Sequence, residues 1–84
     1  MYRLEPTKAF VKSLKKLSGY EQKSVAVKLK LLVENPYHPS LRTKKVQGLK
    51  EIFECSVNMD IRILWKHEGN RLILLIDIGH HDIL

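Results

Sequence analysis

The sequence predicts an α+β fold: a two-helix antiparallel hairpin packed on a mostly antiparallel four-stranded sheet, in the chain order β-α-α-β-β-β. Two observations support this prediction. Apolar residues recur at helical spacing over residues 8–17 and 20–34, and they alternate with polar residues over 53–57 and 61–66. The chain has 84 residues, of which 44% are hydrophobic and 29% charged. This length and composition predict a single globular domain over residues 1–84, with one modest core.

The ends of the first elements follow from local signals. Residues 1–6 alternate weakly and predict a short strand that ends at Pro6. Thr7 is a suitable N-cap for the first helix, which Ser18-Gly19 is expected to end. Asn35-Pro36 ends the second helix, because proline cannot continue a helix. The short connection between the helices predicts an antiparallel pair lying over the sheet.

Side-chain parity predicts the first hairpin of the sheet. A turn of three residues, 58–60, brings the apolar sets of both strands to one face and places Ser56 opposite Arg62. Cys55 and Trp65 then lie in the core. The full core set of this hairpin is Phe53, Cys55, Val57, Ile61, Ile63 and Trp65.

A two-residue turn at Gly69-Asn70 predicts the second hairpin. Its register sets Arg62 directly against Asp77, Trp65 against Leu74, and Ile63 against Ile76. The residues expected to join the core are Leu72, Leu74, Ile76 and Ile78, whereas those expected on the face of Arg62 are Ile73, Leu75, Asp77 and His81. Arg62 then has two interpretations, a structural ion pair with Asp77 or a phosphate ligand, and substrate could displace the first.

Positive charge favours an anionic partner. The formal net charge is +6, and basic residues gather in the long loop 36–48 next to the polar face of the sheet. Nucleic acid or an acidic protein fits this charge, although surface lysines are also common on proteins without such partners. Tyr37 in the loop either stacks on a base or packs on the loop itself.

Several classes of function are disfavoured. A lone cysteine excludes an internal disulfide, and Cys55 is expected to be an inert core residue. No apolar run is long enough to span a membrane and no signal peptide is evident, so a cytoplasmic protein without membrane contact is expected. The His80-His81-Asp82 triplet is not expected to bind a metal, because adjacent strand residues point to opposite faces. Neither a metal nor a cofactor is predicted.

The order of elements, together with several short motifs, resembles the RelE/ParE superfamily of toxins from bacterial toxin–antitoxin modules. The likeness is greatest to the RelE/StbE and YafQ-like branches and spans nearly the whole chain. The motifs are Asn35-Pro36, His38-Pro39, Leu41, Gly48-Leu49, residues 53–57, the arginine-bearing strand 60–66, and the closing segment 76–82 with its Gly-x-His-Asp pattern.

The resemblance implies a RelE-like fold and a metal-independent endoribonuclease (an mRNA interferase) that cuts mRNA on the ribosome. Arg62 would stabilise charge on the phosphate, His81 would act as acid or base, and Glu54 is a weaker candidate base. The residues expected to hold the RNA backbone are Arg42, Lys44, Lys45, Lys50 and Lys66. The implied partners are a cognate acidic antitoxin, the ribosome and mRNA, with DNA contacted only through the antitoxin complex.

Two alternatives remain within the same fold. One is a ParE-like gyrase inhibitor, and the other is a catalytically inactive homologue that still binds an antitoxin. Many superfamily members carry an aromatic residue just past the closing His-Asp, and this sequence has none there, which favours the alternatives. Arg62 and His81 on one face, beside a basic loop, favour the nuclease.

Overall fold

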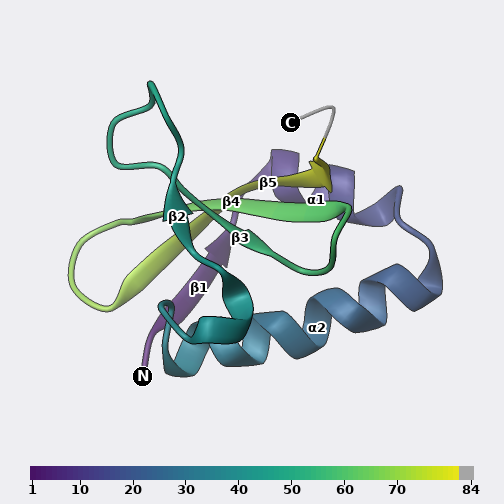
Figure 1. Cartoon of the computed structure of the whole chain (residues 1–84), viewed down its shortest axis with the longest axis horizontal. Helices are drawn as coiled ribbons and strands as arrows, with labels where there is room; N and C mark the ends of the chain where they lie inside the picture. Colours follow the sequence, from purple (N-terminus) through teal and green to yellow (C-terminus); the bar gives the residue numbers. More distant parts are fainter. Residues whose placement is uncertain (82–84) are drawn as a thin grey trace.

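The computed structural model describes residues 1–81 and shows two helices packed against a five-stranded sheet (Figure 1). The elements are β1 (Arg3–Pro6), α1 (Lys8–Lys15), α2 (Gly19–Glu34), the 3-10 turn η1 (Pro39–Leu41), β2 (Lys44–Lys45), β3 (Phe53–Ser56), β4 (Ile61–His67) and β5 (Leu72–His80). The strand order is β1-β5-β4-β3-β2, and every pairing is antiparallel except that of β1 with β5. The predicted fold class is confirmed. The short strand β2 adds a fifth strand within the segment expected to be a loop.

Side-chain caps define the start of both helices. Thr7 accepts a hydrogen bond from the backbone N–H of Phe10, which confirms it as the N-cap of α1. α1 ends at Lys15, two residues before the predicted end. Ser18 does not end α1; it caps α2 through a reciprocal capping box with Glu21. Asn35 ends α2 as expected.

The helix α1 lies beside the C-terminal half of β5. β1 pairs only with Leu72–Leu75, and beyond that point α1 takes the place of a neighbouring strand. The Thr7 hydroxyl donates to the carbonyls of Leu75 and Ile76, and the Ser13 hydroxyl donates to Asp77 at 2.7 Å. Figure 1 shows α1 behind β5 and α2 along the lower side of the view.

The first hairpin has the predicted register. Ser56 pairs with Arg62 and Cys55 with Ile63 across β3 and β4. The Asn58 side chain accepts hydrogen bonds from two backbone N–H groups of the turn, those of Asp60 and Ile61, both at 2.8 Å. The predicted core set of this hairpin is buried apart from Phe53, which packs against the core at partial burial. These strands therefore form the centre of the core together with Phe10, Val25 and Leu32 from the helices.

The second hairpin differs from the prediction. Its loop has three residues, 69–71, because the Glu68 N–H bonds to the Leu72 carbonyl, and Gly69 and Arg71 take positive φ angles of 76° and 62°. The strands are shifted further by a β-bulge between Leu64 and Trp65. Arg62 consequently pairs with Gly79, not with Asp77.

This shift changes which residues of β5 are buried. Trp65 pairs with Leu75 and Ile63 with Ile78. Ile73 and Leu75 are in the core, so their predicted position on the Arg62 face is wrong, as is the core position predicted for Leu72, Leu74 and Ile76. Ile78 is buried as expected. A slip of one residue exchanges the two faces of a strand, and β5 is apolar on both faces, so alternation gave no preference between the registers.

Candidate functional site

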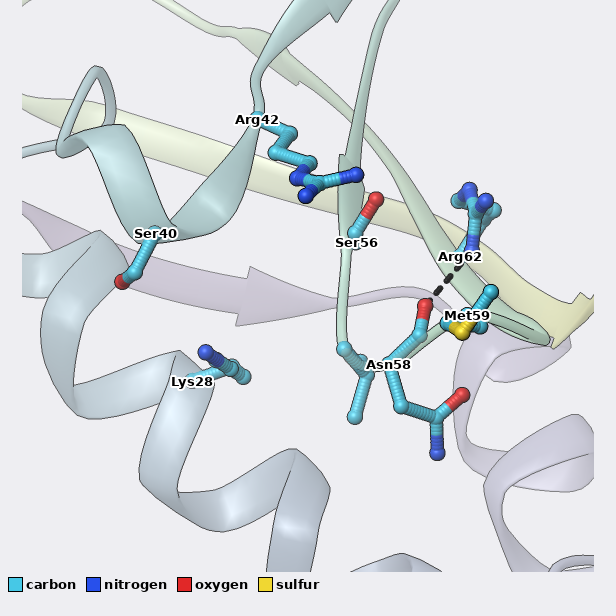
Figure 2. A pocket seen from close by; sticks show the side chains of 8 residues that line it. Lys28, Ser40, Arg42, Ser56, Asn58, Met59 and Arg62 are labelled. Atoms are coloured by element: carbon cyan, nitrogen blue, oxygen red, sulfur yellow. Dashed lines mark hydrogen bonds between the residues drawn. The ribbon is translucent and has the colours of Figure 1, made fainter.

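A pocket of about 290 Å³ opens where α2, η1 and the β3–β4 hairpin meet (Figure 2). β2 pairs only with Phe53 and Glu54. On the side away from β4, Ser56 therefore has no strand beside it in the described chain. The pocket lies at this edge. Its charged and polar lining consists of Lys28, Ser40, Arg42, Ser56, Asn58 and Arg62.

The turn between β3 and β4 holds Arg62 in place. Nη1 of Arg62 donates to the backbone carbonyl of Asn58 at 2.7 Å and to that of Ile61 at 3.3 Å. A guanidinium has five N–H donors in a planar fork. In the described part of the chain, the hydrogen bonds of this guanidinium are made through Nη1 alone, so its remaining edge is available to a ligand.

Arg42 reaches the pocket from an unusual backbone conformation. It follows η1 with φ 51° and ψ 43°, in the left-handed region that non-glycine residues occupy at a penalty of about 1–2 kcal/mol. Leu41 just before it is fully buried and anchors the turn. Figure 2 shows the Arg42 guanidinium extending from this turn toward the side of the pocket that carries Ser56.

Among residues 1–81, the cations of the pocket have no carboxylate partner. No Asp or Glu from residues 1–81 lines the pocket. The ion pairs found over this range are Lys44–Glu54 at 3.3 Å, Lys66–Glu68 at 3.4 Å and His80–Glu21 at 3.4 Å. Three cations without a carboxylate partner in the described chain, together with the serine and asparagine groups of the lining, suit an oxyanion, phosphate above all.

The predicted ion pair between Arg62 and Asp77 is wrong. Asp77 pairs across the sheet with Leu64, and its carboxylate accepts hydrogen bonds from the Ser13 hydroxyl and the Ile78 N–H. The register shift at the bulge separates the two side chains. Asp77 therefore does not hold Arg62 in a structural ion pair.

The predicted site residues are only partly brought together. Arg42 and Arg62 share the pocket. Glu54 is bound to Lys44, and Lys66 to Glu68. The side chains that lie outside the pocket lining are Glu54, Lys44, Lys45, Lys50, Lys66 and His81.

His81 follows the last residue of β5. It is exposed, and its backbone N–H donates to the Asp60 carbonyl. Its neighbour His80 pairs across β4 with Ile61 and contacts Glu21 of α2. Asp82, the third residue of the histidine-rich triplet, lies outside the described residues.

Sequence reasoning missed Lys28, Ser40 and Asn58. A signal existed for Lys28, because it interrupts the apolar stripe of α2. Ser40 and Asn58 carry no such signal, since serine and asparagine in turns are common for local reasons.

Other chemistry finds no support in the described residues. Burial raises the pKa of the Cys55 thiol to about 12, which disfavours a nucleophilic thiolate. Residues 1–81 contain no group of three or more metal-ligating side chains. The described helices also lack the length and apolar character required to cross a bilayer.

Comparison with known families decides the identity. The family model described as "ParE toxin of type II toxin-antitoxin system, parDE" matches residues 4–84. The chain belongs to this ParE toxin family. It is thus a toxin of a toxin–antitoxin module, and the superfamily resemblance noted from its motifs is confirmed.

Solved structures of other proteins share this fold. A metal-bound toxin from Helicobacter pylori is 27% identical with a TM-score of 0.82, and the alignment covers 100% of this chain and 99% of that one. RelE in the RelE–RelB complex of Pyrococcus horikoshii OT3 is 16% identical, with a TM-score of 0.80 and coverage of 99% and 98%. YafQ from E. coli is 17% identical, with a TM-score of 0.78 and coverage of 98% and 96%. No curated protein sequence matches the chain.

Proposed function

We propose that this ParE-family toxin is an mRNA endonuclease that acts on the ribosome, and that the basic pocket binds a phosphate of the RNA strand. The observation that carries the proposal is the convergence of Lys28, Arg42 and Arg62 without a carboxylate among the described residues. The likeness to the RelE and YafQ branches adds support from fold. The proposed reaction requires a cytoplasmic protein.

The proposed chemistry uses the 2′-hydroxyl of RNA as the nucleophile. Cleavage needs a base near that oxygen, an acid near the leaving 5′-oxygen, and positive charge on the transition state. Arg62 would supply the charge through the edge of its guanidinium that faces away from Asn58. His81 and, less strongly, Glu54 remain the candidates for proton transfer.

We further propose an acidic antitoxin as the partner. Structural neighbours of this chain were solved as complexes, RelE with RelB and YafQ with DinJ. A net charge of +6 on 84 residues favours an acidic chain, and a partly disordered antitoxin that folds on binding would suit so small a toxin.

Expression of the wild type and of Arg62→Ala in cells, with mapping of mRNA 5′ ends, tests the nuclease. We expect cuts within translated codons for the wild type and a reduction of about 10²- to 10³-fold for Arg62→Ala, because a donor to the transition state is lost. Arg3→Ala removes an exposed arginine from β1 and should cleave like the wild type. Antitoxin binding should survive in both variants.

The match to a ParE family model favours one competing function, inhibition of gyrase. DNA breaks in place of mRNA cuts would establish that function and contradict the nuclease. An expressed, folded wild-type protein without toxicity would indicate the inactive homologue.

A further inference from the structure

Lys28 interrupts the buried stripe of α2. It lies three residues after Val25 and four before Leu32, a spacing that places all three on one helix face. Val25 is 1% exposed and Leu32 is fully buried. An apolar side chain is the residue expected between them, because a half-buried ammonium stabilises the fold less than an aliphatic group does.

The side chain of Lys28 lines the pocket and is only partly buried. In Figure 2 it stands on α2 at the lower left of the pocket, across from Arg42 on the η1 turn and from Arg62 on β4. A lysine can bury its methylene stem and keep its ammonium in water, and the pocket provides that water. Lys28 is absent from the ion pairs found over residues 1–81.

Three cations held around one small pocket repel one another. Lys28, Arg42 and Arg62 come from three separate elements, so no local constraint forces them together. An anion between them would convert this repulsion into attraction. Ser56 can donate a hydroxyl hydrogen bond to the same anion. Residues that break the folding pattern at a site of this kind are expected where function requires them.

We infer that Lys28 is a substrate-binding residue which, with Arg42 and Arg62, holds a phosphate group of a single-stranded RNA in the pocket. On this inference, a lysine at this half-buried position serves binding and lowers the stability of the fold. That the phosphate belongs to RNA rests on the proposed function, whereas the inference that the site binds phosphate rests on the residues of the pocket alone. Arginine presents a planar fork and lysine a point charge, so together they contact different oxygens of the phosphate.

Lys28→Met tests this inference, because methionine keeps the length and apolar stem of lysine and removes the charge. Binding of inorganic phosphate and of a short single-stranded RNA would be measured by NMR titration of purified protein, following the amides of Ser56 and Asn58. We expect both affinities to fall about tenfold in Lys28→Met, since a hydrogen bond to a charged group is lost. The Tm should rise, since an apolar group replaces an ammonium in the stripe.

Two further variants make the test specific. Lys30→Met removes the same charge from an exposed position of the same helix and should leave binding unchanged. Lys28→Arg keeps the charge and should retain most of the binding. A purely structural role of Lys28 would instead lower the Tm in Lys28→Met and leave both affinities as in the wild type, which would overturn the inference.

The outcome for this site can be separated from the outcome for the nuclease. Phosphate and RNA binding that depend on Lys28, in a wild type that cuts no mRNA, would support the site and overturn the nuclease. Normal binding and cleavage by Lys28→Met would overturn the role of Lys28 and support the nuclease. Binding of inorganic phosphate without RNA binding would overturn RNA as the source of the phosphate.

Discussion

Two groups of basic side chains flank the β3–β4 hairpin, and they differ in their carboxylate partners. Lys44 and Lys66, expected from the sequence to bind RNA, are paired with Glu54 and Glu68. The cations of the pocket, Lys28, Arg42 and Arg62, have no such partner in the described chain. Each of these cations adds one unit of positive charge, whether or not it has a carboxylate partner. A cationic side chain that can bind an anionic ligand is therefore better recognised by its lack of a carboxylate partner than by the number of basic residues near it in the sequence.

The energetic basis of this difference is simple. An exposed ion pair such as Lys44–Glu54 contributes about 0–1 kcal/mol, and a phosphate would have to displace the carboxylate to bind the lysine. Within residues 1–81, the pocket cations give up no ion pair when a phosphate binds. The attraction of the phosphate also offsets their mutual repulsion. A phosphate should therefore prefer the pocket to the paired lysines.

The largest effect should come from giving the pocket a carboxylate of its own. Ser56 lies directly opposite Arg62 in the antiparallel pair, so Ser56→Asp would place a negative charge beside the guanidinium. We expect phosphate affinity to fall about tenfold or more, because the new charge both occupies Arg62 and repels the ligand. Titration with inorganic phosphate and an RNA cleavage assay measure the effect.

Asn70→Asp serves as the control for Ser56→Asp, since it makes the same change in net charge on the exposed β4–β5 turn. It should bind phosphate like the wild type. Equal losses in the two variants would show that total charge matters and that the pocket does not.

A smaller effect on ligand binding should follow from freeing a paired lysine. Glu54→Gln leaves Lys44 without its partner, so the free energy of unfolding should change by no more than about 1 kcal/mol and RNA affinity should rise. Denaturant unfolding and RNA titration at two salt concentrations check both expectations. The same variant tests Glu54 as a base, because a lost general base lowers cleavage by about 10²- to 10⁴-fold. Unimpaired cleavage would remove Glu54 from the mechanism.

The smallest effect concerns Glu21, a carboxylate that already has partners. The hydrogen bond from the Ser18 backbone N–H lowers its pKa, with added contributions from the Ser18 hydroxyl and from His80. A lowered pKa in the folded state means that this stabilisation is present above the ordinary glutamate pKa and is lost as the pH falls through the folded value. Stability should therefore decrease in mild acid.

Glu21→Gln isolates the contribution of Glu21, because glutamine also completes a capping box but does not titrate in this range. The variant should match the wild type more closely as the pH falls from neutral to about pH 3. Denaturant unfolding across that range measures the difference. A constant difference between the two proteins would contradict the assigned pKa shift.

Much of the fold could be predicted because its signals are local. Thr7 and Pro36 mark helix ends through their own backbone chemistry, and the odd-numbered turn 58–60 fixes the parity of the first hairpin. The second hairpin could not be predicted in the same way. Its strand is apolar on both faces, and the bulge at Leu64 and Trp65 leaves no clear mark in the sequence.

The candidate site divides along the same line. The sequence alone determined that Arg62 stands opposite Ser56 and that the chain carries excess positive charge, since alternation and composition are properties of neighbouring residues. Only the tertiary structure brought Lys28 and Arg42 to Arg62, because those three residues meet through the packing of a helix and a turn against the edge of β3. Only the structure, too, distinguished paired from unpaired cations. Such pairings depend on distances in space that spacing along the chain does not encode.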